Sequence, residues 1–209
     1  MQTKSSQEQI INQAIQFHLK GNILEAAKYY QYCIKEGFND HRVFLNYSVI
    51  LQGLGKLKEA ELSTRKAIEL KPNYARAYYN QGGILIDLGK LQKAELSTRK
   101  AIELKPDLAE AHLNLGNILK DLGKSQEAEL SYRKAIELKP DYADAHSNLG
   151  VLLKDLGKLK EAEISLRKAI ELKPDLAEAH YNQGGILIDL GKLQEAELST
   201  RKAIELKPD

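Results

Sequence analysis

The sequence repeats with a period of 34 residues, and this period constrains the fold more than any other feature. The period is visible in the prolines (Pro72, Pro106, Pro140, Pro174 and Pro208) and in the glycines (Gly21, Gly55, Gly89, Gly123, Gly157 and Gly191). A fixed period of this length is typical of a solenoid of stacked units rather than of one globular core. Counting back from the prolines gives a polar N-terminal arm, residues 1–6, and six units, residues 7–40, 41–74, 75–108, 109–142, 143–176 and 177–209. Positions are numbered from the start of each unit.

Each unit carries two apolar stripes at steps of three and four residues. In residues 109–142 the first stripe is His112, Leu115, Ile118, Leu119 and Leu122, and the second is Ala128, Ala135, Ile136 and Leu138. This spacing predicts two amphipathic helices, called here the first and second helix of a unit. Gly123 is expected to end the first helix and Pro140 the second. Asp107 and Asp175, each followed three residues later by glutamate, are expected to cap the next helix.

Small residues recur where the two helices of a unit should cross. Position 8 is Ala14, Ser48, Gly82, Gly116, Gly150 and Gly184, and position 20 is alanine in every unit. Two helices approach closely only where neither carries bulk. Position 27 is alanine except for Cys33, the one cysteine, which is therefore interpreted as a small buried residue rather than a reactive thiol.

This set of positions resembles the tetratricopeptide repeat family over residues 7–209. Unit 4 carries the family's small–aromatic–small–proline pattern in Ala128, Tyr132, Ala135 and Pro140. The resemblance implies an all-α, right-handed α-solenoid of six helix-turn-helix units, which binds a protein or an extended peptide in a concave groove. The family's usual tryptophan is absent from the first helix, and position 7 is glutamine in units 3 and 6 (Gln81 and Gln183). A buried glutamine needs hydrogen-bond partners, so these two units are expected to pack less tightly.

Composition narrows the classes of partner and compartment. The net charge is only +2 although 29% of the residues are charged, which argues against a nucleic-acid-binding protein. One cysteine is consistent with a reducing compartment, and the N-terminus lacks a secretory signal pattern. No apolar run approaches the ~20 residues of a membrane span. A cytoplasmic protein is therefore expected.

In the family that the chain resembles, first helices line the inner groove, chiefly through positions 2, 5, 6, 9, 12 and 13. Position 6 is asparagine in all six units: Asn12, Asn46, Asn80, Asn114, Asn148 and Asn182. An asparagine amide both donates to and accepts from a peptide group, so such a row can hold an extended chain by its backbone. The row resembles the asparagine ladder in the superhelix of O-linked N-acetylglucosamine transferases. The alternative, in which these amides bond locally or to water, stays open.

Other groove positions offer weaker candidates. Tyr79 and Tyr181 at position 5 could stack on a ligand side chain, or could be partly buried against neighbouring helices. Asp87, Asp121, Asp155 and Asp189 at position 13 could form an acidic edge or pair with Lys120 and Lys154. Position 5 holds no lysine, which excludes the family's carboxylate clamp. His112, His146 and His180 recur one unit apart, too far to share a metal ion, and are predicted to be packing residues.

No catalytic constellation is apparent. Gly82 and Gly83 lie within a helical pattern and lack the strand and lysine of a phosphate-binding loop. We therefore expect no enzymatic activity, no cofactor and no metal, and interpret the chain as a binding scaffold. Two alternatives are a substrate-recruiting arm of a larger bacterial sulfotransferase or glycosyltransferase, and a structural array that associates end to end. The second alternative expects Ala203 and Ile204 of the last helix to be exposed.

Overall fold

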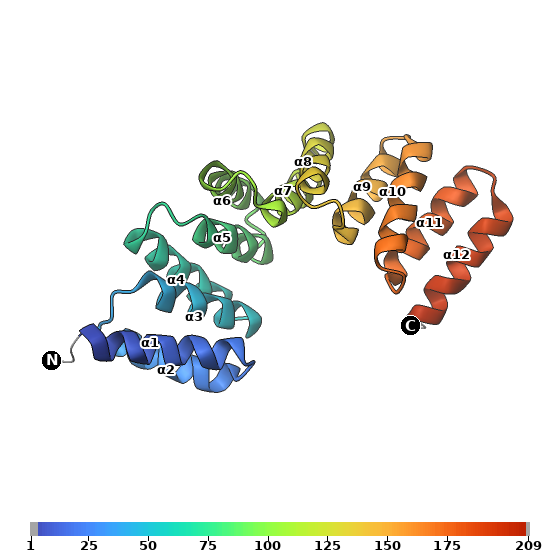
Figure 1. Ribbon diagram of the computed structural model, residues 1–209. Coiled ribbons are helices and arrows are strands. Elements are labelled where there is room, and N and C mark those ends of the chain that lie inside the picture. The colour runs from blue at the N-terminus through green and yellow to red at the C-terminus, as the bar shows by residue number, and fades with distance from the viewer. Residues whose placement is uncertain (1–3, 208–209) are drawn as a thin grey trace. The chain divides into compact units, whose positions relative to one another are not determined.

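The computed structural model describes residues 4–207, which form twelve α-helices and no strand (Figure 1). The first helices of the six units are α1 (Lys4–Leu19), α3 (His41–Gly53), α5 (Ala75–Asp87), α7 (Ala109–Asp121), α9 (Ala143–Asp155) and α11 (Ala177–Asp189). The second helices are α2 (Ile23–Lys35), α4 (Leu57–Leu70), α6 (Leu91–Leu104), α8 (Ser125–Leu138), α10 (Leu159–Leu172) and α12 (Leu193–Leu206).

The chain divides into two compact halves, residues up to 106 and residues from 107, which are described separately. The first half contains α1–α6 and the second contains α7–α12. In each half every helix packs against the next one, and neighbouring first helices also touch, as α3 touches α5 and α9 touches α11. This successive packing confirms the predicted all-α solenoid of helix pairs.

The expected helix stops are confirmed, since glycine follows the first helix of each unit in the left-handed conformation, for example Gly123 with φ 74°. The amide of Lys124 then donates to the carbonyl of Leu119 at 2.8 Å, which closes the helix end. Residues 4–6, assigned above to a polar arm, instead form the start of α1, and residues 1–3 of that arm lie outside the described residues.

The predicted aspartate caps are wrong. Helix α11 begins at Ala177 with Leu176 at its N-cap, and α7 likewise has Leu108 there, both without a side-chain cap. The Leu176 amide donates to the Lys173 carbonyl at 3.1 Å, so Pro174 and Asp175 are the central residues of a tight turn. This turn places the aspartate one residue before the cap position. Asp40 does cap its helix, accepting from the Arg42 amide at 2.8 Å.

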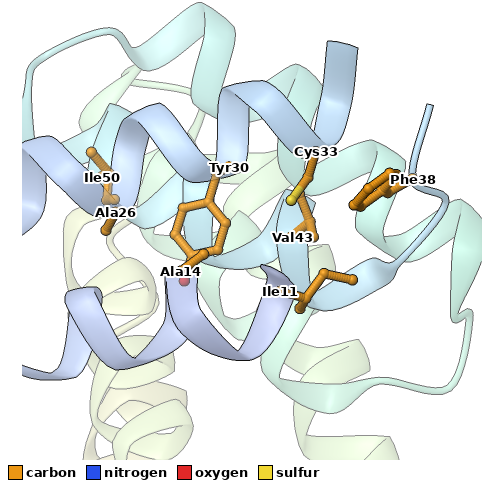
Figure 2. Close-up of a cluster of buried hydrophobic side chains, with 8 residues drawn as sticks. All are labelled: Ile11, Ala14, Ala26, Tyr30, Cys33, Phe38, Val43 and Ile50. Carbon is orange, nitrogen blue, oxygen red and sulfur yellow. The ribbon is translucent and has the colours of Figure 1, made fainter. Parts of the chain in front are cut away.

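The small residues lie at the helix crossings as predicted. The alanines at position 20 are buried in every unit, and a methyl group added to Gly116 would overlap the ring of Tyr132. In the first unit, Tyr30, Cys33 and Phe38 pack in a cluster with residues of α1 and α3 (Figure 2). Burial raises the pKa of Cys33 to about 11, so its thiol is protonated at neutral pH. The interpretation of Cys33 as a buried core residue is confirmed.

Candidate functional site

A hollow of about 410 Å³ lies on the surface formed by the first helices of the N-terminal half. It is lined by Ile15, His18, Leu19, Leu45, Asn46, Val49, Gln52, Tyr74, Arg76 and Asn80. These residues come from α1, α3 and α5 and from the turn before α5. Asn46 and Asn80, two of the six predicted asparagines, therefore share one hollow and are half-buried in it.

The lining of this hollow combines apolar and polar groups. Leu19 is 76% exposed and Val49 is 40% exposed, so both present apolar surface to a ligand. Gln52 Nε2 donates to Asp87 Oδ2 at 2.7 Å, which links α3 to α5 at one end. For position 13 the sequence left open an acidic edge or a pair with lysine, and at Asp87 the partner is a glutamine. In the C-terminal half a pair with lysine, one of the two alternatives, is present, with Lys154 Nζ 3.7 Å from Asp189 Oδ2.

Tyr30 lies in the core behind Asn46. Its hydroxyl is buried and has no hydrogen-bond partner among the described residues. Burial raises the pKa of Tyr30 to about 12, and the side chain of Asn46 opposes this rise. The side chain of Asn46 therefore lies close to this buried hydroxyl as well as in the hollow.

In the C-terminal half, Asn148 is held by a neighbouring side chain. Asn117 Oδ1 accepts from both the hydroxyl of Tyr132 and Nδ2 of Asn148, each at 2.8 Å. This network spans α7, α8 and α9 and fixes the direction of the Asn148 amide, whose carbonyl oxygen has no partner in it. Asn114 and Asn182 are half-buried on the equivalent positions of their helices. Asn12, in the first unit, is exposed.

The two candidate tyrosines occupy different settings. Tyr79 is half-buried, and the Arg76 guanidinium carbon lies 5.5 Å from the centre of its ring. Tyr181 is 67% exposed and borders a hollow with Ala203 and Ile204 of α12. At the same position in unit 2, Leu45 is buried against Ala77 of the next unit. Tyr181 therefore lies on the face that stacks on a following helix pair elsewhere in the chain.

Gln81 and Gln183, the glutamines at position 7, each have a hydrogen-bond partner. Gln81 Oε1 accepts from the Ser97 hydroxyl at 3.0 Å, and Gln183 Oε1 accepts from the Ser199 hydroxyl at 3.0 Å. In both units the first helix is thereby tied to the second, so the polar group causes no loose packing at these atoms.

The recurrent histidines have a structural contact. His146 Nε2 is 3.0 Å from the carbonyl of Pro140, and His180 makes the same contact with Pro174. Each histidine ties its helix to the preceding turn, in keeping with the predicted packing role. Within residues 4–207 no three His, Cys, Asp or Glu side chains are grouped to hold a metal ion.

Ion pairs on the second helices connect neighbouring units. The carboxylate of Glu129 accepts from Arg133 on its own helix and from Lys158 of the next unit, at 2.9 Å each. Hydrogen bonds from Lys158 and Arg133 lower the pKa of Glu129, although partial desolvation opposes them. Glu61 with Lys90 and Glu163 with Lys192 repeat this link.

Sequence analysis missed several residues of the site. Arg76 at position 2 and Gln52 at position 12 line the hollow, and Asn117 at position 9 directs Asn148. The signal that could have found them is variation: these positions are groove positions in the family, and each differs from unit to unit.

Within residues 4–207, twelve helices in successive pairs, with small residues at the crossings, define a helical repeat protein. Profiles described as TPR repeat match residues 82–123 and 116–157, and profiles described as tetratricopeptide repeat match residues 41–74, 64–95, 143–176 and 177–209. Together they span residues 41–209, and the chain belongs to the tetratricopeptide repeat family. No curated protein matches the chain.

Solved structures support the same assignment. YrrB, described as a TPR protein with an unusual peptide-binding site, is 27% identical, with a TM-score of 0.70 over 88% of this chain and 95% of YrrB. MamA is 26% identical, with a TM-score of 0.71 over 77% of this chain and 94% of MamA. PilF of Pseudomonas aeruginosa is 17% identical but has a TM-score of 0.86 over 98% of this chain and 93% of PilF, which shows a shared fold.

None of the described helices is both long and apolar enough to cross a membrane.

Proposed function

We propose that this protein is a cytoplasmic, non-catalytic scaffold that binds an extended peptide segment along the surface of its first helices. The observation that carries the proposal is the hollow in the N-terminal half, where the half-buried amides of Asn46 and Asn80 flank exposed apolar side chains. The amides hydrogen-bond to the peptide backbone, and the apolar lining contacts one side chain of the ligand. The likeness to YrrB supports the same kind of ligand.

The asparagines are proposed to act as a ladder for the peptide backbone in both halves. Asn114 and Asn182 have the half-burial seen for Asn46 and Asn80, and Asn148 is pre-oriented by Asn117. Pre-orientation lowers the entropy lost on binding, because the side chain is already fixed. Tyr79, beside Asn80, adds an aromatic face to this surface.

The test is a double substitution with a matched control. Asn46 and Asn80 are changed to alanine in one variant, and Gln92 and Gln126, exposed amides on second helices, are changed in the other. Peptides selected from a displayed library of random sequences are titrated against both by fluorescence anisotropy. Loss of two hydrogen bonds at roughly 1 kcal/mol each weakens binding about 30-fold in the asparagine variant. Equal affinity of the two variants would refute the ladder.

A second proposal concerns self-association through α12. Ile188, Leu193 and Ile204 are all more than half exposed and line one hollow of about 550 Å³ between α11 and α12. Ala203, which was expected to be exposed with Ile204, is buried instead because it packs at the crossing of the last helix pair. Exposed apolar surface of this kind favours contact between two copies. Light scattering should show association at high concentration that Ile204→Lys abolishes; a strict monomer would refute it.

A further inference from the structure

The charge at position 2 differs between the two halves of the chain. In the N-terminal half this position is Glu8, Arg42 and Arg76, and in the C-terminal half it is Glu110, Asp144 and Glu178. Arg42 is already used, since its guanidinium binds Glu8 at 2.7 Å and Asp40 at 2.7 Å. The surroundings of Arg76, the other arginine at position 2, differ from those of Arg42.

Arg76 lines the hollow and has no carboxylate partner within residues 4–207. Its guanidinium carbon lies 5.5 Å from the centre of the Tyr79 ring. Lys71 adds a second cation nearby, with Nζ 4.9 Å from the ring centre of Tyr74, which also lines the hollow. Burial lowers the pKa of His18, so this third basic residue of the site is neutral at pH 7.

The carboxylates around the hollow are occupied or distant. Glu8 and Asp40 are bound to Arg42, and Asp87 accepts from Gln52 at 2.7 Å. Arg76 is the second residue of α5 and Asp87 its last, so about 16 Å of helix separates them. The positive helix N-terminus also lies at the Arg76 end. The hollow therefore has a cationic end that attracts a carboxylate and an opposite end that does not.

We propose that the hollow selects a partner segment in which an aliphatic residue stands close to an acidic one. This inference rests on the proposed function and names the chemistry of its ligand. The aliphatic side chain lies among Ile15, Leu19 and Val49, the acidic group pairs with Arg76, and the amides of Asn46 and Asn80 hold the backbone. The charge pair also fixes the direction of the peptide along α5.

The test is a charge reversal with a control at the equivalent place on another helix. Arg76→Glu changes the second residue of α5, and Lys58→Glu changes the second residue of α4, which is also exposed and lies outside the hollow. An acidic residue in the first helical turn is favourable, so both variants fold. Each is used, with the native chain, to select peptides from the same displayed library of random sequences.

We expect the native chain and Lys58→Glu to enrich Asp or Glu beside Leu, Ile or Val. Arg76→Glu should lose this enrichment and select Lys or Arg instead. For synthetic copies of one selected peptide, anisotropy should show that replacing its acidic residue by the neutral amide weakens binding to the native chain roughly two- to fivefold, and not to Arg76→Glu.

A second pair of variants tests the apolar part. Leu19 and Leu24 are each 76% exposed, but only Leu19 lines the hollow. Leu19→Ser should weaken binding of the selected peptides about tenfold, and Leu24→Ser should leave it unchanged.

The two proposals fail in different ways. If peptides are selected and depend on Asn46 and Asn80 but show no acidic preference, the scaffold function stands and the charge selection is wrong. If no peptide binds above the level of an unrelated protein, or if binding ignores the asparagines, the proposed function fails and this inference fails with it.

Discussion

The substitution Gly116→Ala tests whether the close crossing of α7 and α8 is required. A methyl group on Gly116 would lie 2.5 Å from Cδ1 and 3.0 Å from Cζ of Tyr132. The ring cannot swing aside freely, because it is buried and its hydroxyl is bonded to Asn117. The control is Gly83→Ala in the middle of α5, where a methyl group meets only Gln52 Nε2, at an ordinary 3.6 Å.

The magnitudes follow from two opposing effects. Replacing glycine by alanine inside a helix stabilises it by about 1 kcal/mol, which Gly83→Ala gains in full. For Gly116→Ala the overlap costs about 1–3 kcal/mol, and displacement of Tyr132 loses the bond to Asn117, which costs about 1 kcal/mol more. The net change for Gly116→Ala is therefore a loss of about 1–3 kcal/mol, set against a gain of up to about 1 kcal/mol for Gly83→Ala.

Urea unfolding followed by far-ultraviolet circular dichroism measures both changes. The predicted order of the unfolding midpoints is Gly83→Ala above the native chain and Gly116→Ala below it. If Gly116→Ala is as stable as the native chain, the two helices have room that this structure does not show, and the account of the crossing is wrong.

Three other predictions concern single side chains. Tyr30→Phe removes a buried hydroxyl that has no hydrogen-bond partner within residues 4–207, and it should leave stability unchanged or raise it by up to about 1 kcal/mol, whereas Tyr132→Phe should cost about 1 kcal/mol. The reverse order in urea unfolding would contradict the hydrogen-bond assignment. Because the pKa of Glu129 is lowered in the folded state, its carboxylate stabilises the fold at pH values above the ordinary glutamate value of 4.5. This contribution is lost as the pH falls through the lowered folded-state value. The urea midpoint of Glu129→Gln should therefore drop less than that of the native chain between about pH 6 and about pH 3. Cys33, with a pKa of about 11, should react with a disulfide reagent only in denaturant, and rapid reaction in the native state would contradict its burial.

The features predicted correctly from the sequence depend on chemistry within one unit. Glycine ends a helix because it takes a positive φ readily, and alanine or glycine at a crossing is required by any close pair of helices. The predicted position of the aspartate caps was wrong by a single residue, because Asp175 is a central residue of the turn that includes Pro174. Such a shift depends on turn geometry that the helical pattern does not specify.

The features that the sequence did not predict depend on contacts between units. Glu129 meets Lys158, and Asn117 meets Asn148, only because stacked helices bring these positions together. The register of that stacking sets the pairs, and it is not contained in the pattern of one unit. Variation at position 2 could have drawn attention to Arg76, but that it has no carboxylate partner within residues 4–207 is visible only once its neighbours are placed.

The most direct test of the central claim is a titration followed through the side-chain amide signals of asparagine in a nitrogen-15 correlation spectrum. The signals are assigned with single Asn→Ala variants, and the ligand is a peptide selected from the displayed library. The account predicts that the amide signals of Asn46 and Asn80 shift on binding, while those of exposed Gln92 and Gln126 do not. Shifts confined to the glutamines of the second helices would show that peptide binds elsewhere and would contradict the account.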